Sequence, residues 1–489
     1  MLWIALTLPE LSLQIAERSS EASHPLVIAC GPDTRPIVFA ANQSARLAGI
    51  HHGMAIASAR TLANDLRVVQ RQAENERDAV HNFACWASQF TPYVSLKQDD
   101  GLLLEVASTL RLHGGLGTLL NKLRMGTDQL GYRVACGVAP TPMAAWLFAR
   151  SREQGLRIRA CTEPDKLELR TASLPLILLD WPPETLRKLS ALGITRIADC
   201  LALPADGFSK RFGPALWLDL QRLLGRLPDP RAYFVLPETY RARTEFGFEV
   251  NDAMALLFPL KRLLSEMEGF LRGRGAGVAE CRILLEHSGK QSSTISIRVA
   301  KPERHTDRLL ALAREHLGRA QLPATVLALG IQVDRLLPLV ESSASWLPDP
   351  REQADGWYQL LDKLGARLGS DNVYRLQPVD EHRPEQAWKS VGVSGTWKTL
   401  SHNHYAQTTR PRPLFLLPSP RKLLIDDELP LCHGKVDLLA GPERIETGWW
   451  DGQTVMRDYY VGRNPYGETL WLFRDLREAG SWHLHGYFA

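Results

Sequence analysis

Three acidic side chains have the type and spacing for metal chemistry: Asp99, Asp100 and Glu105. They lie in residues 93–106, which predict a strand, an acidic turn and a second strand. A metal-dependent nucleotidyl transferase holds its carboxylates on two adjacent central strands, which fix a pair of divalent cations about 4 Å apart. The expected neighbouring strand, residues 2–8, is apolar and is followed by the first carboxylate only at Glu10. One strand alone does not hold two cations, so the pattern argues against catalysis.

Composition limits the class of protein. The chain has 489 residues, 45% of them hydrophobic and 23% charged, so we expect three or four packed domains. The net charge of +4 permits nucleic-acid binding without arguing for it. The seven cysteines form no CxxC pair, which fits free thiols in a reducing cytoplasm and argues against a disulfide framework or a structural zinc site. We expect no signal peptide and no membrane span, because no apolar run approaches about 20 residues.

Short strands and helices must position the acidic residues. Residues 25–41 predict a strand–turn–strand unit, and two short helices and a strand follow up to residue 70. Apolar residues recur at helical spacing in residues 75–90, which predicts a core helix behind the strand pair. The elements expected next are a helix near 116–130, a strand at 132–138 and a helix at 142–150. The fold class is therefore α+β, with several domains.

The middle of the chain predicts two modules that could meet nucleic acid. Residues 174–212 form short helices broken by Pro and Gly, as in helix–hairpin–helix units whose backbone amides hold a phosphate. After a linker at 227–240, a helix at 251–271 opens a β/α module that ends near residue 333. Basic residues along its strands could follow a DNA backbone, although a solvated face explains them equally well. The candidate DNA-binding residues are Arg282, Lys290, Arg298, Lys301 and Arg304.

The order of these pieces resembles a Y-family translesion DNA polymerase. Residues 46–50 (RLAGI), followed by Gly53-Met54, are similar to the family's fingers segment. Residues 136–140 (CGVAP) are similar to a palm strand–turn, and residues 191–194 (ALGI) to the start of a thumb helix. The implied organisation is a palm at 1–25 and 71–165, fingers at 26–70, a helix–hairpin–helix thumb at 166–230, a little finger at 231–340, a connector with a helix at 341–385 and a small β-rich, partner-binding C-terminal domain at 386–489.

The sequence departs from this family where the family does its chemistry. The first metal-binding Asp of the family aligns with Ala5, and its Asp-Glu pair aligns with Asp100 and Gly101, so one carboxylate survives. Arg46 is the remnant of the triphosphate-binding residues. The other aligned positions read Gln43 for a Tyr, Pro9 and Glu10 for two aromatics, Pro142 and Trp146 for two lysines, and Asp180-Trp181-Pro182 for the thumb hairpin glycines. The resemblance implies no catalytic residue, no metal and no cofactor, and Asp100 is expected to be a solvated turn residue.

The last third of the chain carries the most specific resemblance. Its motifs are 382–385 (HRPE), 441–446 (GPERIE), 448–451 (GWWD), 457–460 (RDYY) and 482–489 (WHLHGYFA). They resemble the catalytically degenerate, polymerase-like subunits of the bacterial DNA-damage-inducible mutagenesis cassette. This implies a non-catalytic adaptor in SOS-type translesion synthesis, located in the cytoplasm at the nucleoid. Its expected partners are the β sliding clamp, a small RecA-like protein, an error-prone C-family polymerase and damaged primer–template DNA.

Two stretches are expected to meet the protein partners. The clamp-binding peptide of the family has an apolar end that fills a pocket, and Trp346 and Leu347 keep that end without the usual Gln. Aromatic and arginine anchors in the last domain are candidate partner-binding residues: Arg444, Trp449, Trp450, Arg457 and Tyr459. Two alternatives stay open. One is a weakly active Y-family polymerase in which Asp99, Asp100 and Glu105 gather a metal; the other is a protein scaffold that does not bind DNA.

Overall fold

The computed structural model describes residues 1–18, 24–32, 34–97, 100–156, 160–339, 350–392, 412–478 and 480–488. The chain divides into two units, residues 1–367 and residues 368–489, and each is described by itself. Within the described residues, no helix is both long enough and apolar enough to cross a membrane. The expected domain names serve below as labels for regions of the first unit.

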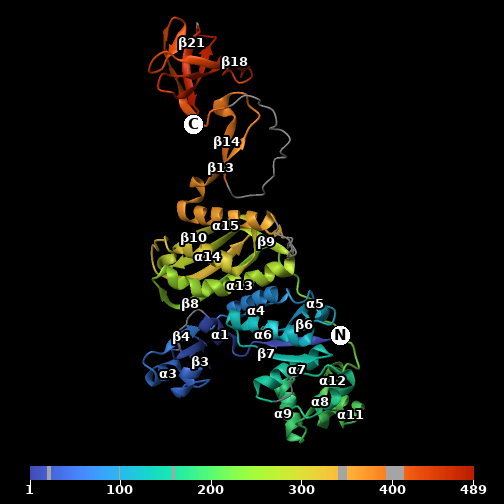
Figure 1. Cartoon of the computed structure of the whole chain (residues 1–489). Helices are drawn as coiled ribbons and strands as arrows, with labels where there is room; N and C mark the ends of the chain where they lie inside the picture. The colour runs from blue at the N-terminus through green and yellow to red at the C-terminus, as the bar shows by residue number, and fades with distance from the viewer. Residues whose placement is uncertain are drawn as a thin grey trace. The chain divides into compact units, whose positions relative to one another are not determined.

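The palm sheet is four-stranded and antiparallel, in the order β5-β6-β1-β7 (Figure 1). Its strands are β1 (Trp3–Thr7), β5 (Val94–Lys97), β6 (Gly101–Glu105) and β7 (Ala135–Ala139). The predicted pairing of the first strand with the strand pair is confirmed, and every residue of β1 is buried because β6 and β7 flank it. Helices α4 (Ala73–Ala87) and α6 (Leu116–Leu130) cover one face, and α7 (Pro142–Glu153) covers the other. Two short helices complete the palm, α1 (Leu11–Arg18) and α5 (Leu110–His113).

The fingers form a small three-stranded sheet in the order β3-β2-β4. Its elements are β2 (Leu26–Cys30), β3 (Ile37–Ala41), α2 (Gln43–Leu47), α3 (Ile56–Leu62) and β4 (Arg67–Gln70), as predicted. The side-chain oxygen of Asn42 accepts hydrogen bonds from the backbone N–H groups of Ala45 (2.9 Å) and Leu26 (3.1 Å). This cap fixes the start of α2 against β2 and so positions Arg46 in the same helix.

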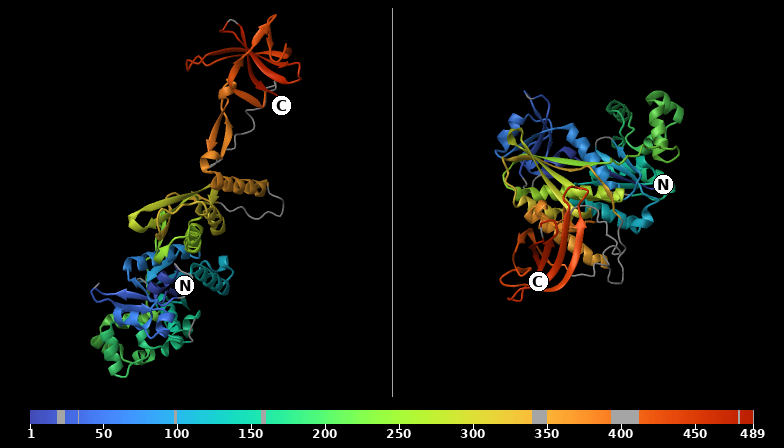
Figure 2. Two further views of the ribbon diagram at one scale, coloured as in Figure 1. Left: turned by 90° about the vertical axis from the view of Figure 1, so that its left-hand side faces the viewer. Right: turned by 90° about the horizontal axis from the view of Figure 1, so that it is seen from above.

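The thumb is a set of short helices packed against α7. They are α8 (Leu167–Ala172), α9 (Pro183–Ala191), α10 (Ile197–Leu201), α11 (Ala205–Phe212) and α12 (Pro214–Leu223). The predicted end of a helix at Leu192-Gly193 is confirmed, because Gly193 takes a left-handed φ of 78° after α9. Thr141 Oγ1 donates to the Leu223 carbonyl (2.8 Å), which ties the thumb to α7. Figure 2 shows the thumb helices (green) and the little finger (yellow) on opposite sides of the palm.

The little finger is a sheet in the order β10-β9-β11-β8 with two helices on one face. Its elements are β8 (Tyr240–Val250), α13 (Leu257–Arg274), β9 (Ala276–His287), β10 (Ser292–Glu303), α14 (Thr306–Leu317), β11 (Val326–Val333) and the short β12 (Leu337–Pro338). Strand β8 is absent from the sequence prediction, which placed a linker and a helix on either side of it. Helix α15 (Pro350–Leu368) follows, and the Asp362 carboxylate accepts from the Ala300 N–H (2.7 Å).

The second unit is built around a five-stranded sheet in the order β15-β21-β20-β19-β18, so the predicted β-rich tail is confirmed. Its strands are β15 (Phe415–Lys422), β18 (Asp437–Thr447), β19 (Val455–Arg463), β20 (Thr469–Asp475) and β21 (Ser481–Tyr487). Two separate antiparallel ribbons accompany the sheet. One pairs β13 (Tyr374–Pro378) with β14 (Trp388–Gly392), and the other pairs β16 (Leu424–Asp426) with β17 (Leu429–Leu431). Arg383 is buried and pairs with Glu381 and Asp451 (2.6 Å each). The segment just before the expected boundary at residue 386 therefore packs against this unit.

Candidate functional site

The candidate catalytic face of the palm is defined by the register of its central strand. Ala5 lies opposite Leu103 of β6, and Thr7 lies opposite Gly101. Directly paired residues of antiparallel strands point to the same side of the sheet, so these four share one face. None of the four carries a carboxylate. The centre of this face is therefore built from apolar and small residues, although Thr7 Oγ1 donates to the Glu153 carboxylate at the end of α7.

Trp146 fills the space beside Gly101. A Cβ atom on Gly101 would lie 2.7 Å from two ring atoms of Trp146 and 2.5 Å from the carbonyl oxygen of Leu6. Trp146 is buried in the middle of α7, and this helix lies so close to β7 that a Cβ on Gly137 would clash with the Ala145 backbone. A glutamate at position 101 has no room unless both Trp146 and the backbone at Leu6 move. The centre is thus filled as well as depleted of ligands.

The acidic residues next to this face have other partners. Asp100 lies in the exposed turn before β6, as expected from the sequence. Partial burial raises the pKa of its carboxyl, and Asp180 acts in the same direction while Arg150 and Lys97 oppose it. Asp180, at the thumb hairpin position, forms ion pairs with Lys97 (3.0 Å) and Arg150. The two cations nearest Asp100 are therefore already neutralised from within the chain.

Glu105 pairs with Trp3 of β1 and so lies on the same face as Ala5, but its carboxylate has backbone partners. Its Oε1 atom accepts hydrogen bonds from the backbone N–H groups of Leu2 and Ala107 (3.2 Å each), so it caps the ends of two strands. Asp99 lies outside the described residues. In the described part of the chain, no three His, Cys, Asp or Glu side chains gather as metal ligands would. The donor set that a metal pair requires is therefore not assembled by these residues.

Arg46, the expected triphosphate remnant, is held by an internal anion. Its guanidinium forms a two-pronged ion pair with the Glu10 carboxylate, at 3.0 and 3.1 Å. Glu10 adopts a left-handed φ of 53°, which is uncommon for a residue with a side chain. The residue aligned with an aromatic in the Y-family thus supplies the negative charge that a triphosphate would bring.

A cavity of about 310 Å³ remains between α7 and the thumb. Its wall includes Trp146 and three basic side chains, each of which has a carboxylate partner. The pairs are Lys97 with Asp180 (3.0 Å), Arg222 with Asp219 (3.2 Å) and Arg231 with Asp229 (2.5 Å). Balanced charges give this cavity little attraction for a phosphate chain.

The candidate DNA-binding residues do not form one surface. Arg282 and Arg298 lie on the sheet face opposite the helices, and they pair with Asp334 and with Glu280 (3.2 Å), respectively. Lys301 is exposed beyond the bulge in β10, and the side chain of Lys290 is not described. Arg304 is only 6% exposed, so the prediction that it lies on an open face is wrong. It follows β10 at the start of α14, where the chain turns inward.

Sequence reasoning missed two arginines on the same open face because it missed β8. Arg241 and Arg243 lie opposite Gln332 and Gly330 of β11. Arg243 forms a two-pronged pair with Glu286 (2.7 Å each), which raises the pKa of the guanidinium further above its ordinary value. Arg241 has no ion-pair partner among the described residues. The alternation of polar and apolar residues over 240–246 (YRARTEF) is the signal that could have found this strand.

The expected partner-binding residues separate into surface and core. Trp449 and Trp450 are 73% and 57% exposed, and their rings make an edge contact 4.8 Å apart. Arg444 is exposed and forms a two-pronged pair with Asp458 (2.8 and 2.9 Å). Tyr459 is buried against Trp471, and its hydroxyl bonds to His485 Nδ1 (2.9 Å). Tyr459 is therefore a core residue, and the prediction that it anchors a partner is wrong.

Arg457 also belongs to the interior of the second unit. It is largely buried, it pairs with Glu385 (3.0 Å), and its guanidinium lies 4.6 Å from the centre of the Phe473 ring. The expected clamp residues Trp346 and Leu347 lie outside the described residues. Of the residues expected to bind protein partners, the two tryptophans and Arg444 are those that the structure places at the surface.

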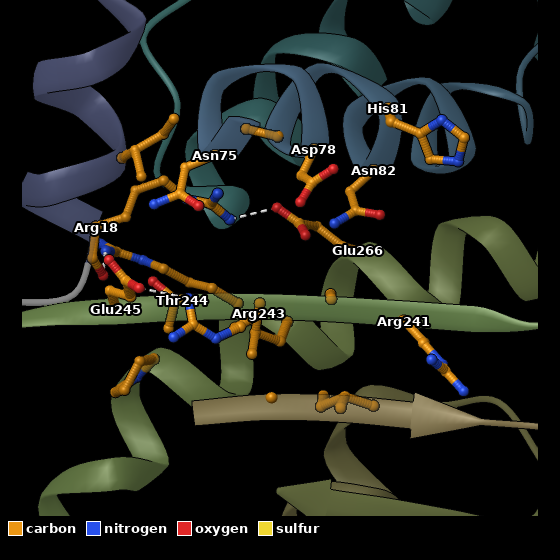
Figure 3. A pocket seen from close by; sticks show the side chains of 18 of the residues that line it. Arg18, Asn75, Asp78, His81, Asn82, Arg241, Arg243, Thr244, Glu245 and Glu266 are labelled. Carbon is orange, nitrogen blue, oxygen red and sulfur yellow. Dashed lines mark hydrogen bonds and ion pairs between the residues drawn. The ribbon is translucent and has the colours of Figure 1, made fainter. Parts of the chain in front are cut away.

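A second cavity, of about 560 Å³, separates α4 from β8 and went unnoticed in the sequence (Figure 3). Asn75, Asp78 and His81 line it from α4, and Arg241 and Arg243 from β8. Its charged groups are of both signs, so the lining does not select a ligand class.

The first likeness is to a class of proteins. Residues 12–150 match the impB/mucB/samB family. DNA polymerase IV of Dehalococcoides mccartyi (strain CBDB1) is 27% identical over 313 residues, which cover 63% of this chain and 74% of that protein. Among solved structures, DinB from Sulfolobus solfataricus aligns with 70% of this chain and 100% of its own at 17% identity, with a TM-score of 0.40.

The second likeness is to a particular protein. Protein ImuB of Caulobacter vibrioides (strain NA1000 / CB15N) is 26% identical over 469 residues, which cover 90% of this chain and 100% of that protein. A match of that length must enter residues 368–489, which the polymerase IV match need not do. The chain therefore resembles ImuB over nearly its whole length, and its sequence also resembles DNA polymerase IV over 63% of the chain.

Proposed function

We propose that this chain is a non-catalytic adaptor in translesion DNA synthesis. It links the β sliding clamp, a RecA-like accessory protein (ImuA or an equivalent) and an error-prone C-family polymerase at damaged primer–template DNA. The observation that carries the non-catalytic part is Trp146, which occupies the space beside Gly101, where the facing positions Ala5 and Gly101 carry no carboxylate. The likeness to ImuB supports the adaptor part.

The physical argument is about charge. Two-metal phosphoryl transfer requires carboxylates that hold two cations between the attacking and leaving oxygens. Here Ala5 supplies none, Gly101 supplies none, and Arg46 is already paired with Glu10. Neither the cations nor the nucleotide triphosphate has a prepared place, so the nucleotide would bind without the positioning on which the reaction depends.

Primer extension by the purified chain tests this proposal, with Mg²⁺ and then Mn²⁺ and with an Asp100→Ala control. We expect no extension with either metal. Extension that disappears in Asp100→Ala would overturn the proposal. A second arm restores the ligands: Ala5→Asp with Gly101→Glu stays inactive, and Trp146→Lys must be added before any extension appears. Activity of the double variant would show that Trp146 does not close the site.

The partner-binding part is tested by pull-down of the clamp, the RecA-like protein and the polymerase with the full chain. We expect Trp449→Ala with Trp450→Ala to weaken at least one partner by about tenfold, because exposed aromatic anchors carry much of the energy of protein interfaces. Tyr466→Ala is the matched control, since Tyr466 is an equally exposed aromatic of the same unit. Equal binding by the double variant and the control would exclude the tryptophan pair as an anchor.

A scaffold that does not bind DNA is the second candidate. The ion pairs of Arg282, Arg298 and Arg243 favour it, because each of these three arginines on the open face already has a carboxylate partner. Fluorescence anisotropy with labelled primer–template DNA separates the two candidates. An adaptor that touches DNA gives an affinity that falls as salt rises, with a slope set by the number of phosphates contacted. No binding to DNA at 50 mM salt would favour the scaffold that does not bind DNA over the adaptor.

A further inference from the structure

Helix α13 presents a second face that is not used by its own sheet. Arg262, Glu266, Gly269 and Gly273 follow each other at spacings of four, three and four residues, which places them along one side of the helix. Its apolar residues, among them Leu263, Met267 and Phe270, belong to the core under the little-finger sheet. The stripe of charged residues and glycines faces the palm.

The glycines of this stripe allow α13 to lie very close to α4. A Cβ on Gly269 would lie 2.6 Å from Gln89 Nε2 and would clash with the Trp86 ring, and a Cβ on Gly273 would clash with the Ser88 hydroxyl. Cys85, on the same side of α4, is buried in the core of the little finger rather than in that of the palm. The two regions therefore share side-chain packing along a continuous seam.

A buried ion pair closes the seam at its other end. Glu266 is 1% exposed and pairs with Arg18, the last residue of α1 (Figure 3). Arg18 Nε also donates to the Leu130 carbonyl (2.7 Å), and its guanidinium lies 3.9 Å from the centre of the Tyr132 ring. Arg262 donates to the Arg18 carbonyl. Separating α13 from the palm would break this ion pair and these hydrogen bonds together.

We infer that this seam locks the little finger and the palm into one rigid body, so that the little finger does not swing about residues 227–239 when the chain meets nucleic acid. The order of layers is palm sheet, α4 with α6, α13, little-finger sheet (Figure 1). The Ala5 face of the palm sheet lies under α7, on the side of that sheet away from α4 and α6. This inference stands independently of the adaptor proposal.

Two native thiols report on the seam. Cys85 lies within it, and Cys281 lies inside the little finger. Both thiols are buried and burial raises the pKa of each to about 12, so each reacts only after an opening exposes it, and a difference in labelling reports on opening. Cys200, in the thumb, has the same raised value and serves as a second internal reference.

Pulsed alkylation of the full chain with iodoacetamide, read by mass spectrometry, tests the lock. In the native chain we expect Cys85 to react as slowly as Cys281, within about threefold, with and without primer–template DNA. Labelling of Cys85 at least about tenfold faster than Cys281, or an acceleration of Cys85 alone by DNA, would show that the seam opens and would overturn the inference.

Two variants sharpen the test. Gly269→Leu wedges the seam and is expected to raise the labelling rate of Cys85 by about tenfold while Cys281 and Cys200 stay slow. Gly117→Leu is the matched control, because Gly117 lies on α6 with open space around its Cβ position. If Gly269→Leu labels all three thiols quickly, that variant is unfolded, and the native chain alone decides. An unchanged Cys85 in a folded Gly269→Leu variant contradicts the lock.

Discussion

The palm face and the arginine face of the little finger are both occupied by the chain's own side chains, but in different ways. On the palm, Trp146 fills the centre and Glu10 holds Arg46. On the little finger, Arg243 and Glu286 pair in the open, where water reaches both. A filled site excludes a ligand by volume, whereas an exposed ion pair can exchange one anion for another at little cost. The first face is therefore closed, and the second is only masked.

The largest expected effect compares two glutamates that both pair with arginine. Glu266→Gln leaves the buried Arg18 without a counter-charge and is expected to reduce the free energy of unfolding by about 3–5 kcal/mol. Glu286→Gln breaks an exposed pair and is expected to cost less than about 1 kcal/mol. Urea denaturation of both variants at pH 7 measures the difference. Equal losses would remove the distinction between the buried seam and the open face.

The next effect concerns the filled centre. Gly101→Glu forces a side chain into the Trp146 ring and is expected to destabilise the first unit by about 3 kcal/mol. Gly117→Glu adds the same charge at an open position of α6 and is expected to change stability by less than about 0.5 kcal/mol. Thermal unfolding followed by circular dichroism compares the two. A well-tolerated glutamate at position 101 would mean that the centre is open after all.

A smaller effect tests whether the second face is only masked. Glu286→Gln releases Arg243, so we expect the affinity of the variant for primer–template DNA to rise by about threefold. The slope of log affinity against log salt should become steeper by about the amount expected for one further phosphate contact. Glu315→Gln is the control, because it frees Arg367 on α15 instead. Anisotropy titrations between 50 and 200 mM salt measure both variants. If neither variant gains affinity, the arginine face is not a nucleic-acid surface.

The smallest effect is a pH dependence of opposite sign on the two faces. Arg243 lowers the pKa of Glu286, so the contribution of this pair is present at pH 7 and is lost as pH falls below about 4. Burial raises the pKa of Asp100, so its ionised form costs stability, and that cost appears as pH rises through the raised value.

Unfolding from pH 3 to 7 should therefore show Glu286→Gln losing stability relative to the native chain as pH rises. Asp100→Asn should gain relative stability over the same range. Parallel curves for the two variants would contradict the assigned environments.

The sequence predicts the elements well where one periodicity dominates. The apolar run at 2–8 and the helical spacing at 75–90 gave β1 and α4 in their expected places. Strand β8 was missed because it directly follows a Pro-rich linker and carries charged residues on its open side. Arg304 was misplaced because strand alternation breaks down at the bulge in β10.

The sequence predicts which carboxylates the candidate site lacks, but not which side chains fill it. The sequence shows that Ala5 and Gly101 lack carboxylates, because that is a property of single positions. It does not show that Trp146, 45 residues along, packs onto Gly101, or that Glu10 takes Arg46, because such contacts depend on how α7 and α2 meet the sheet. Likewise, Tyr459 looked like an interface anchor until its ring proved to be packed against Trp471.

The contact between Trp146 and Gly101 also constrains how this lineage can change. Restoring a glutamate at 101 alone creates a clash, restoring an aspartate at 5 alone buries a lone charge, and removing the Trp146 ring alone leaves a void in the core. Each single substitution therefore lowers stability. The contact between Trp146 and Gly101 thus couples three positions, because carboxylates at 5 and 101 can be accommodated only together with a different side chain at 146.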